Sequence, residues 1–136
     1  MKRNLMITAA LALLTTTAAS AQTVNVKATV PFSFIVGRSA HPAGEYSVQT
    51  VNNGGVLAIS NPDAKSTNLV LSNACEALRA ASGTKLVFHR YADRYFLRQI
   101  WTEGNNRGRE IPISEREQET AKNSIMQEVL LVAAKY

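Results

Sequence analysis

Short runs in which apolar and polar side chains alternate recur along this chain, and turn signals separate them. Residues 23–30 read TVNVKATV, and the same alternation returns at residues 46–50 and 56–60. Strict alternation is typical of a half-buried strand, because successive side chains of a strand point to opposite faces of the sheet. The sequence NNGG at 52–55 favours a tight turn between the last two runs. These segments predict strands joined by hairpin turns.

Extending this pattern along the chain predicts a mainly β fold, a small antiparallel sandwich or barrel of about seven or eight short strands. One helix is expected near the C-terminus. It would begin after Ser114, because Ser114 and Glu117 have the spacing of a capping box. The glutamates at 115–119 are interpreted as the solvated start of this helix. Residues 126–134 are either a final strand or a continuation of the helix, and their short apolar run favours the strand.

Two segments show no clear pattern. Residues 73–83 are expected to form a loop with at most one helical turn, although ACEALRAA has helical propensity. Residues 102–109, TEGNNRGR, are expected to form a polar, glycine-rich loop.

The N-terminus has the layout of a secretory signal peptide, predicted to span residues 1–21. Lys2 and Arg3 precede a short apolar stretch, and the small residues at 19–21 fit a cleavage site. The apolar stretch is shorter than the roughly 20 residues that a membrane-spanning helix needs, and no later stretch is long enough. We therefore expect residues 22–136 to form a single β-rich domain that is exported to the periplasm or the cell exterior.

Charge and cysteine content exclude several classes of protein. Without Lys2 and Arg3, the 15 basic residues become 13 against ten acidic ones, a formal net charge of +3. This is too small for a nucleic-acid-binding signature. Cys75 is the only cysteine, so no internal disulfide forms. Its side chain is either buried, which we favour, or exposed and able to form an intermolecular disulfide.

The richest segment is LVFHRYADRYFLRQIW, residues 86–101, which reads as two strands joined by a tight turn of two residues, Ala92 and Asp93, or of three, with Arg94. The sequence leaves the register of the hairpin open between these two turn lengths. With a two-residue turn, Phe88 would lie opposite Leu97 and His89 opposite Phe96. Its arginines and aromatic rings are candidates for binding an acidic glycan or another polyanion. The candidate ligand-binding residues are Arg90, Tyr91, Arg94, Tyr95, Arg98 and Trp101. The simpler interpretation, which we favour, is that the rings pack the core and the arginines pair with glutamates.

Other chemistries have less support in the sequence. A carrier for a small ligand is an alternative, with a pocket lined by Phe32, Phe34, Phe88 and Trp101. No metal site is predicted, because His41, Cys75 and His89 are dispersed and His41 is expected to be solvated in a turn. No cofactor is predicted either. A hydrolase using Cys75, His89 and Asp93 is conceivable, but no motif frames these residues.

Three blocks resemble a group of small, exported, uncharacterised proteins common in acidobacteria. The blocks are VPFSFIVGRSAHPAGEYSV, KLVFHRYADRYFLRQIW and GNNRGREIPISEREQE, in this order behind the signal peptide. The resemblance implies export and a β-rich domain, but no activity, cofactor or site residue. The sequence therefore predicts an exported, non-enzymatic β domain that acts through surface contacts, with a protein or an acidic glycan as the candidate partner.

Overall fold

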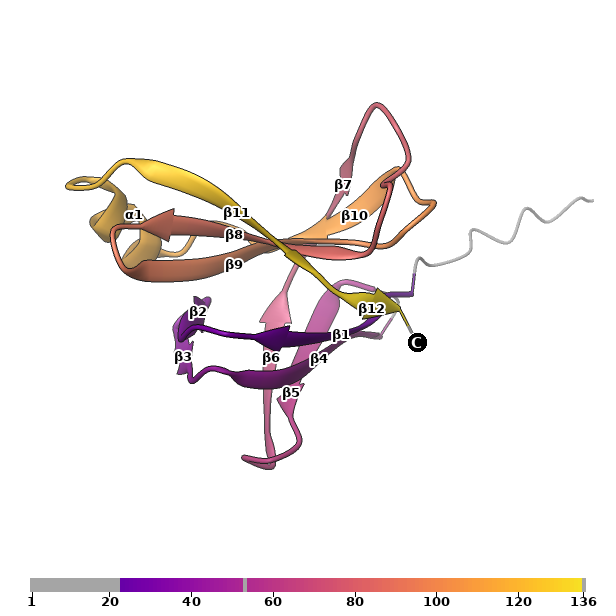
Figure 1. Cartoon of the computed structure of the whole chain (residues 1–136), viewed down its shortest axis with the longest axis horizontal. Helices are drawn as coiled ribbons and strands as arrows, with labels where there is room; N and C mark the ends of the chain where they lie inside the picture. Colours follow the sequence, from indigo (N-terminus) through magenta and orange to yellow (C-terminus); the bar gives the residue numbers. More distant parts are fainter. Residues whose placement is uncertain (1–22, 53, 136) are drawn as a thin grey trace, which may run out of the picture.

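The computed structural model describes residues 23–52 and 54–135, so the predicted signal peptide, residues 1–21, lies outside the described part. The described residues form two stacked sheets and one helix (Figure 1). The five-stranded sheet has the order β12 (Ala134–Lys135), β1 (Asn25–Val30), β4 (Gly44–Val51), β5 (Val56–Asn61) and β6 (Ser66–Leu71). The main path of the seven-stranded sheet is β11 (Met126–Val132), β8 (Lys85–Tyr91), β9 (Arg94–Trp101), β10 (Arg107–Glu110) and β7 (Asn73–Glu76). The remaining elements are β2 (Phe34–Val36), β3 (Ser39–His41) and the helix α1 (Glu115–Ala121).

This architecture confirms the mainly β class with one short helix near the C-terminus. The two sheets form a sandwich and do not close into a barrel. The described residues contain twelve strands rather than seven or eight. The additional ones are β3, β7, β10 and β12, which are two to four residues long. Strands this short leave no alternating pattern to detect in the sequence.

The core lies between the two sheets. On β1, exposed and buried residues alternate strictly, as the sequence predicted. Aromatic rings fill the centre: the Phe34 ring meets the Tyr46 ring edge-on at 4.8 Å, and Phe88 at 5.6 Å. Edge-to-face contacts of this kind add to the stabilisation that comes from burial.

The hairpin of β8 and β9 turns at Ala92 and Asp93, and Ala92 has a positive φ of 56°. Phe88 pairs with Leu97 and His89 with Phe96, which is the register expected for a two-residue turn. Further along, Val87 pairs with Gln99, so the register shifts by one residue and Arg98 is the extra residue of a β-bulge. Because of this bulge, both Leu97 and Ile100 belong to the core between the sheets.

Helix α1 covers the second face of this hairpin (Figure 1). Ala121 packs there against a small apolar cluster of Ile35, Tyr91 and Phe96. The predicted N-cap is confirmed, since the Ser114 hydroxyl accepts a hydrogen bond from the Glu117 N–H at 3.2 Å. The helix ends at Ala121 and the following segment forms β11, so the strand interpretation of residues 126–134 was the correct one.

The predictions for residues 73–83 and 102–109 were partly wrong. Residues 73–76 form β7, which pairs antiparallel with β10 at residues 107–110. Each strand supplies the other's backbone hydrogen bonds, and this tertiary pairing overrides the helical propensity of the first segment. Only residues 77–83 and 102–106 remain as loops. Among the described residues, no helix is long and apolar enough to cross a membrane.

Candidate functional site

The hairpin residues predicted to bind a ligand are divided between two faces of the sheet. Tyr91 and Arg98 hydrogen-bond to Glu117 of α1, so they lie on the helix side. Tyr95 instead stacks on Phe32, with ring centroids 3.8 Å apart. Phe32 packs against the core, which places Tyr95 on the opposite side of the hairpin.

The other three predicted residues are also apart from one another. Arg90 lies over the Tyr95 ring, 5.4 Å from its centroid, and its Nε donates to the Ala92 carbonyl. Arg94 is exposed beside the turn. Trp101 is buried at the far end of β9, and its indole N–H donates to the Gln99 side chain at 3.0 Å. The six residues do not form one continuous surface, and ligand binding by them stays a prediction.

A buried carboxylate organises the helix side of the hairpin. The Glu117 side chain is only 1% exposed. Its oxygens accept hydrogen bonds from the Tyr91 hydroxyl at 3.1 Å and from the Arg98 guanidinium at 3.1 and 3.2 Å. Arg98 also donates to the Ile111 carbonyl and lies 3.4 Å from Glu110. This network joins α1 to β9 and to the segment that precedes the helix.

The interpretation of Glu117 as a solvated helix residue was therefore wrong. The Ser114 cap starts the helix so that Glu117 and Ala121, four residues apart, lie on the face that packs against the sheet. The pairing of hairpin arginines with nearby glutamates, by contrast, is confirmed for Arg98 with Glu117. A pair that was not predicted joins Arg107 to Glu76 at 2.9 Å. The sequence signal for Glu117 was the four-residue spacing to an alanine, which is too common to identify a buried acid.

His89 borders this network on its solvent side. Its Nδ1 lies 3.5 Å from a Glu117 oxygen, a separation that makes an ion pair only if the imidazole is protonated. Burial and the nearby Arg98 guanidinium lower the pKa of His89, and they outweigh the carboxylates of Glu117 and Glu128. The imidazole is therefore neutral near pH 7, and its contact with Glu117 is not a charged one.

The network holds α1 against the hairpin through hydrogen bonds to the Glu117 carboxylate. Burial, and then the Glu117 charge, raise the pKa of the Tyr91 hydroxyl, so that it keeps its proton and donates. The Glu117 carboxylate already has donors on both oxygens.

Cys75 is half-buried on β7 and far from His89. Their strands β7 and β8 are separated by β9 and β10, a distance of roughly 14 Å at about 4.8 Å per strand. Burial, together with the Glu110 charge, raises the pKa of the Cys75 thiol. A raised pKa lowers the fraction of thiolate, which is the nucleophilic form. The structure therefore does not bring together the Cys75, His89 and Asp93 grouping that the sequence left conceivable.

The expectation that His41 is solvated was wrong. His41 is 9% exposed, and its ring stacks on Phe34 at 5.3 Å. Its Nε2 lies 3.3 Å from the Asn68 side-chain nitrogen. The reason is that β3 pairs with β2, which turns this histidine inward. Burial lowers the pKa of His41.

The residues proposed to line a carrier pocket do not share one. The Phe32 and Phe88 rings touch edge-on at 5.0 Å, and Phe34 packs on Phe88, so these rings fill the interior between the sheets. Trp101 is separate and lines a hollow on the outer side of the seven-stranded sheet.

That outer hollow encloses about 460 Å³ beneath the loop of residues 77–82. Trp101, Val87 and Leu130 form its apolar part, and Lys85 and Glu128 stand among its polar lining. Beside it, β11 carries exposed apolar side chains. Sequence reasoning missed this hollow because its walls come from β8, β9, β11 and a distant loop, which are brought together only by the fold.

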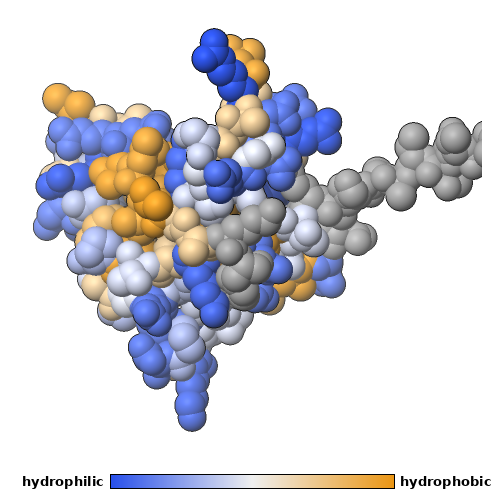
Figure 2. Space-filling model, turned by 45° about the vertical axis from the view of Figure 1, so that its right-hand side comes forward, coloured by the Kyte–Doolittle hydropathy of each residue, from blue (hydrophilic) through white to orange (hydrophobic). Residues whose placement is uncertain are grey.

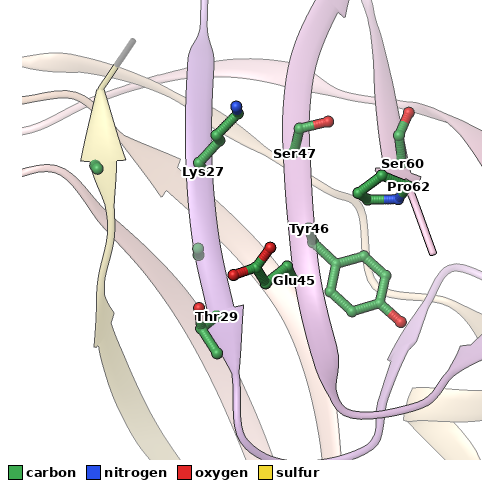
Figure 3. Close-up of a pocket in the computed structure, with 9 residues that line it drawn as sticks. Lys27, Thr29, Glu45, Tyr46, Ser47, Ser60 and Pro62 are labelled. Atoms are coloured by element: carbon green, nitrogen blue, oxygen red, sulfur yellow. The ribbon is translucent and has the colours of Figure 1, made fainter.

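A second open hollow, of about 520 Å³, lies on the five-stranded sheet. Figure 3 shows Lys27, Thr29, Glu45 and Ser47 beside it on β1 and β4, whereas the Tyr46 ring is turned away toward the core. One amine and one carboxylate leave this lining without a dominant charge, so it does not favour a strongly charged ligand.

Within the described ranges, no group of three or more histidine, cysteine, aspartate and glutamate side chains is placed to hold a metal ion. Comparisons of the chain with protein-family models, with curated proteins and with solved structures found no match.

Proposed function

We propose that this chain is an exported, non-enzymatic β-sandwich that acts by binding an extended segment of another protein, in the cell envelope or outside the cell. The observation that carries the proposal is the outer surface of β11, the last strand of its sheet. Leu130 and Val132 are exposed there at alternate positions, and Val132 is 87% exposed. Met126 is exposed on the same face, on the other side of Glu128. Contiguous exposed apolar groups on a folded domain mark contact surfaces for other proteins.

The hollow beside β11 supports this choice of partner. Leu130 borders both the strand surface and the hollow above Trp101. A partner segment that lies along β11 would place one apolar side chain in the hollow, where the indole and Val87 would bury it. Buried apolar anchors of this kind contribute most of the binding energy of protein interfaces.

The other candidate functions have less support. Binding of a polyanion by the hairpin would need Arg98 and Tyr91, and both are committed to Glu117. An enzymatic role would need a reactive group, but the pKa of the Cys75 thiol is raised and the Glu117 carboxylate is paired. An intermolecular disulfide through Cys75 remains a subordinate proposal, since the half-buried thiol lies on the edge strand β7.

Site-specific photocrosslinking in the source cell tests the proposal. A photoreactive phenylalanine at position 130 is expected to give one discrete protein adduct, and Val132→Lys should abolish it while leaving the circular dichroism spectrum unchanged. The same group at position 45, on the outer face of the other sheet, is the matched control. An adduct pattern that is identical at both positions, or unaffected by Val132→Lys, contradicts the proposal. Recovery of the uncleaved chain from the cytoplasm would contradict export.

A further inference from the structure

Strand β6 is a second exposed sheet edge, on the other sheet. It pairs with β5 along its whole length, and among the described residues no strand pairs with its other side. Leu69 and Leu71 on its outer face are 62% and 71% exposed. Val70, which faces the interior, is itself only partly buried, consistent with an edge that is open to solvent.

The outer face beside this edge is apolar. The register places Leu69 next to Ala58 and Leu71 next to Val56 on β5. These four side chains form an apolar strip, which we call the β6 strip. Toward the other end of the strand the face becomes polar, where the hydroxyls of Ser60 and Thr67 lie 3.2 Å apart.

The backbone of β6 presents hydrogen-bonding groups to the open side. The Ser72 N–H donates to the Gly55 carbonyl on the β5 side. In an antiparallel pair, the N–H and C=O groups of successive residues point alternately toward and away from the paired strand. Since those of Ser72 point toward β5, those of Leu71, Leu69 and Thr67 point away from it. They are therefore available to another strand.

Charge distinguishes β6 from other edges of this molecule. Residues 66–75 contain no lysine, arginine, aspartate or glutamate, whereas the edge strands β7 and β11 contain Glu76 and Glu128. Folded proteins usually protect sheet edges by charged residues, proline or bulges. β6 has none of these, and its ladder with β5 is regular.

We propose that β6 pairs antiparallel with β6 of a second copy of this chain, joining two five-stranded sheets across a two-fold axis. A two-fold axis places the same edge on both sides of the interface, so an edge with charges of one sign would repel its copy and this neutral one does not. With Leu69 on the axis, Leu69 faces its counterpart and Thr67 faces Leu71. The two β6 strips then meet on one face of the joined sheet. This dimer uses a different edge from the β11 surface.

Sedimentation over a range of concentrations tests the proposal with the exported chain. Because β6 is only six residues long, the interface is small, and we expect an equilibrium that approaches twice the single-chain mass as concentration rises. Leu69→Lys places two like charges at the axis and should leave the mass at that of one chain. Leu130→Lys, an exposed leucine on the other edge, is the matched control and should leave the dimer intact.

Cysteine crosslinking tests the register. In a Cys75→Ser background, Leu69→Cys is expected to form a disulfide-linked dimer, because residues paired at the axis lie about 5.5 Å apart. Thr67→Cys should not, since it faces position 71 of the other copy. A dimer that survives Leu69→Lys, or that Leu130→Lys dissociates, overturns the proposal. So does a wild-type chain that stays monomeric, which would leave this edge to a strand of a different protein.

Discussion

At the scale of single residues, the network around Glu117 is the most consequential feature of the structure. It satisfies a buried carboxylate with a guanidinium and a phenol, each from a different strand of the hairpin. Taking charges out of water is costly, and the cost is recovered only while both partners are present. The network therefore determines where α1 sits rather than contributing a large net stability.

Removing the carboxylate should destabilise the domain strongly. Glu117→Ala leaves Arg98 nearly buried, with only the half-exposed Glu110 as an anionic partner. We expect the free energy of unfolding to fall by about 3–5 kcal/mol, measured by denaturant titration. Glu119→Ala is the control on the same helix, because Glu119 is exposed and pairs with Lys122. It should change stability by no more than about 0.5 kcal/mol. Equal losses in the two variants would contradict this account.

At the scale of elements, the pairing of β9 with β10 depends on a glycine. A Cβ atom at position 108 would lie 2.7 Å from the Ile100 carbonyl oxygen and 2.8 Å from the Trp101 ring. The indole therefore lies directly over the Gly108 backbone. This close approach links β10 to β9 and so contributes to the wall of the hollow that Trp101 lines.

Gly108→Ala should displace Trp101. We expect a loss of about 1–3 kcal/mol, typical of overpacking, with a shift of the tryptophan fluorescence maximum. Gly83→Ala provides the comparison, because a Cβ at that position meets nothing within 4 Å. It should leave both the fluorescence and the melting temperature close to those of the parent chain. An unchanged fluorescence spectrum in Gly108→Ala would show that the ring does not need this space.

At the scale of the whole molecule, two sheets share one core and are linked by the C-terminal segment. β11 belongs to the seven-stranded sheet, and after Ala133 the chain continues into β12 of the other sheet. The outer edges β6 and β11 remain open, and apolar areas alternate with hydrophilic ones on the face shown in Figure 2. These two open edges are the ones that the proposed contacts with other chains use.

The stability of the whole domain should fall as the solution becomes acidic. Burial lowers the pKa of both His41 and His89, so the unfolded chain binds more protons than the folded one below its own histidine pKa of about 6.5. The contribution of the two histidines to the free energy of unfolding is fully present above that pH. It is lost as the pH falls through the lower pKa values that these histidines have in the folded state. The melting temperature should therefore drop between pH 7.5 and about 5.5, a range above the ordinary glutamate pKa.

The two histidines can be separated in this experiment. His89→Gln and His41→Asn should each flatten part of the pH dependence, because the replaced side chain no longer takes up a proton on unfolding. A melting temperature that is constant or that rises toward pH 5.5 would contradict the direction of both pKa shifts.

The sequence alone determined the features that depend on near neighbours. Alternation predicted β1, β4 and β5, and Ser114 predicted the start of α1. Each of these features depends on side-chain direction or helix capping, which a short stretch of sequence contains. The register of the β8–β9 hairpin was left open, because the sequence allowed a turn of two or three residues and one residue of slip swaps the faces.

Only the tertiary structure decided what these elements bury and expose. Glu117 meets Tyr91 across 26 residues and Arg98 across 19, and β7 meets β10 across more than thirty. The burial of His41 and the hollow over Trp101 likewise need several distant strands at once. Alternation shows that a strand has two different faces, but which neighbour covers each face is decided when the sheets pack.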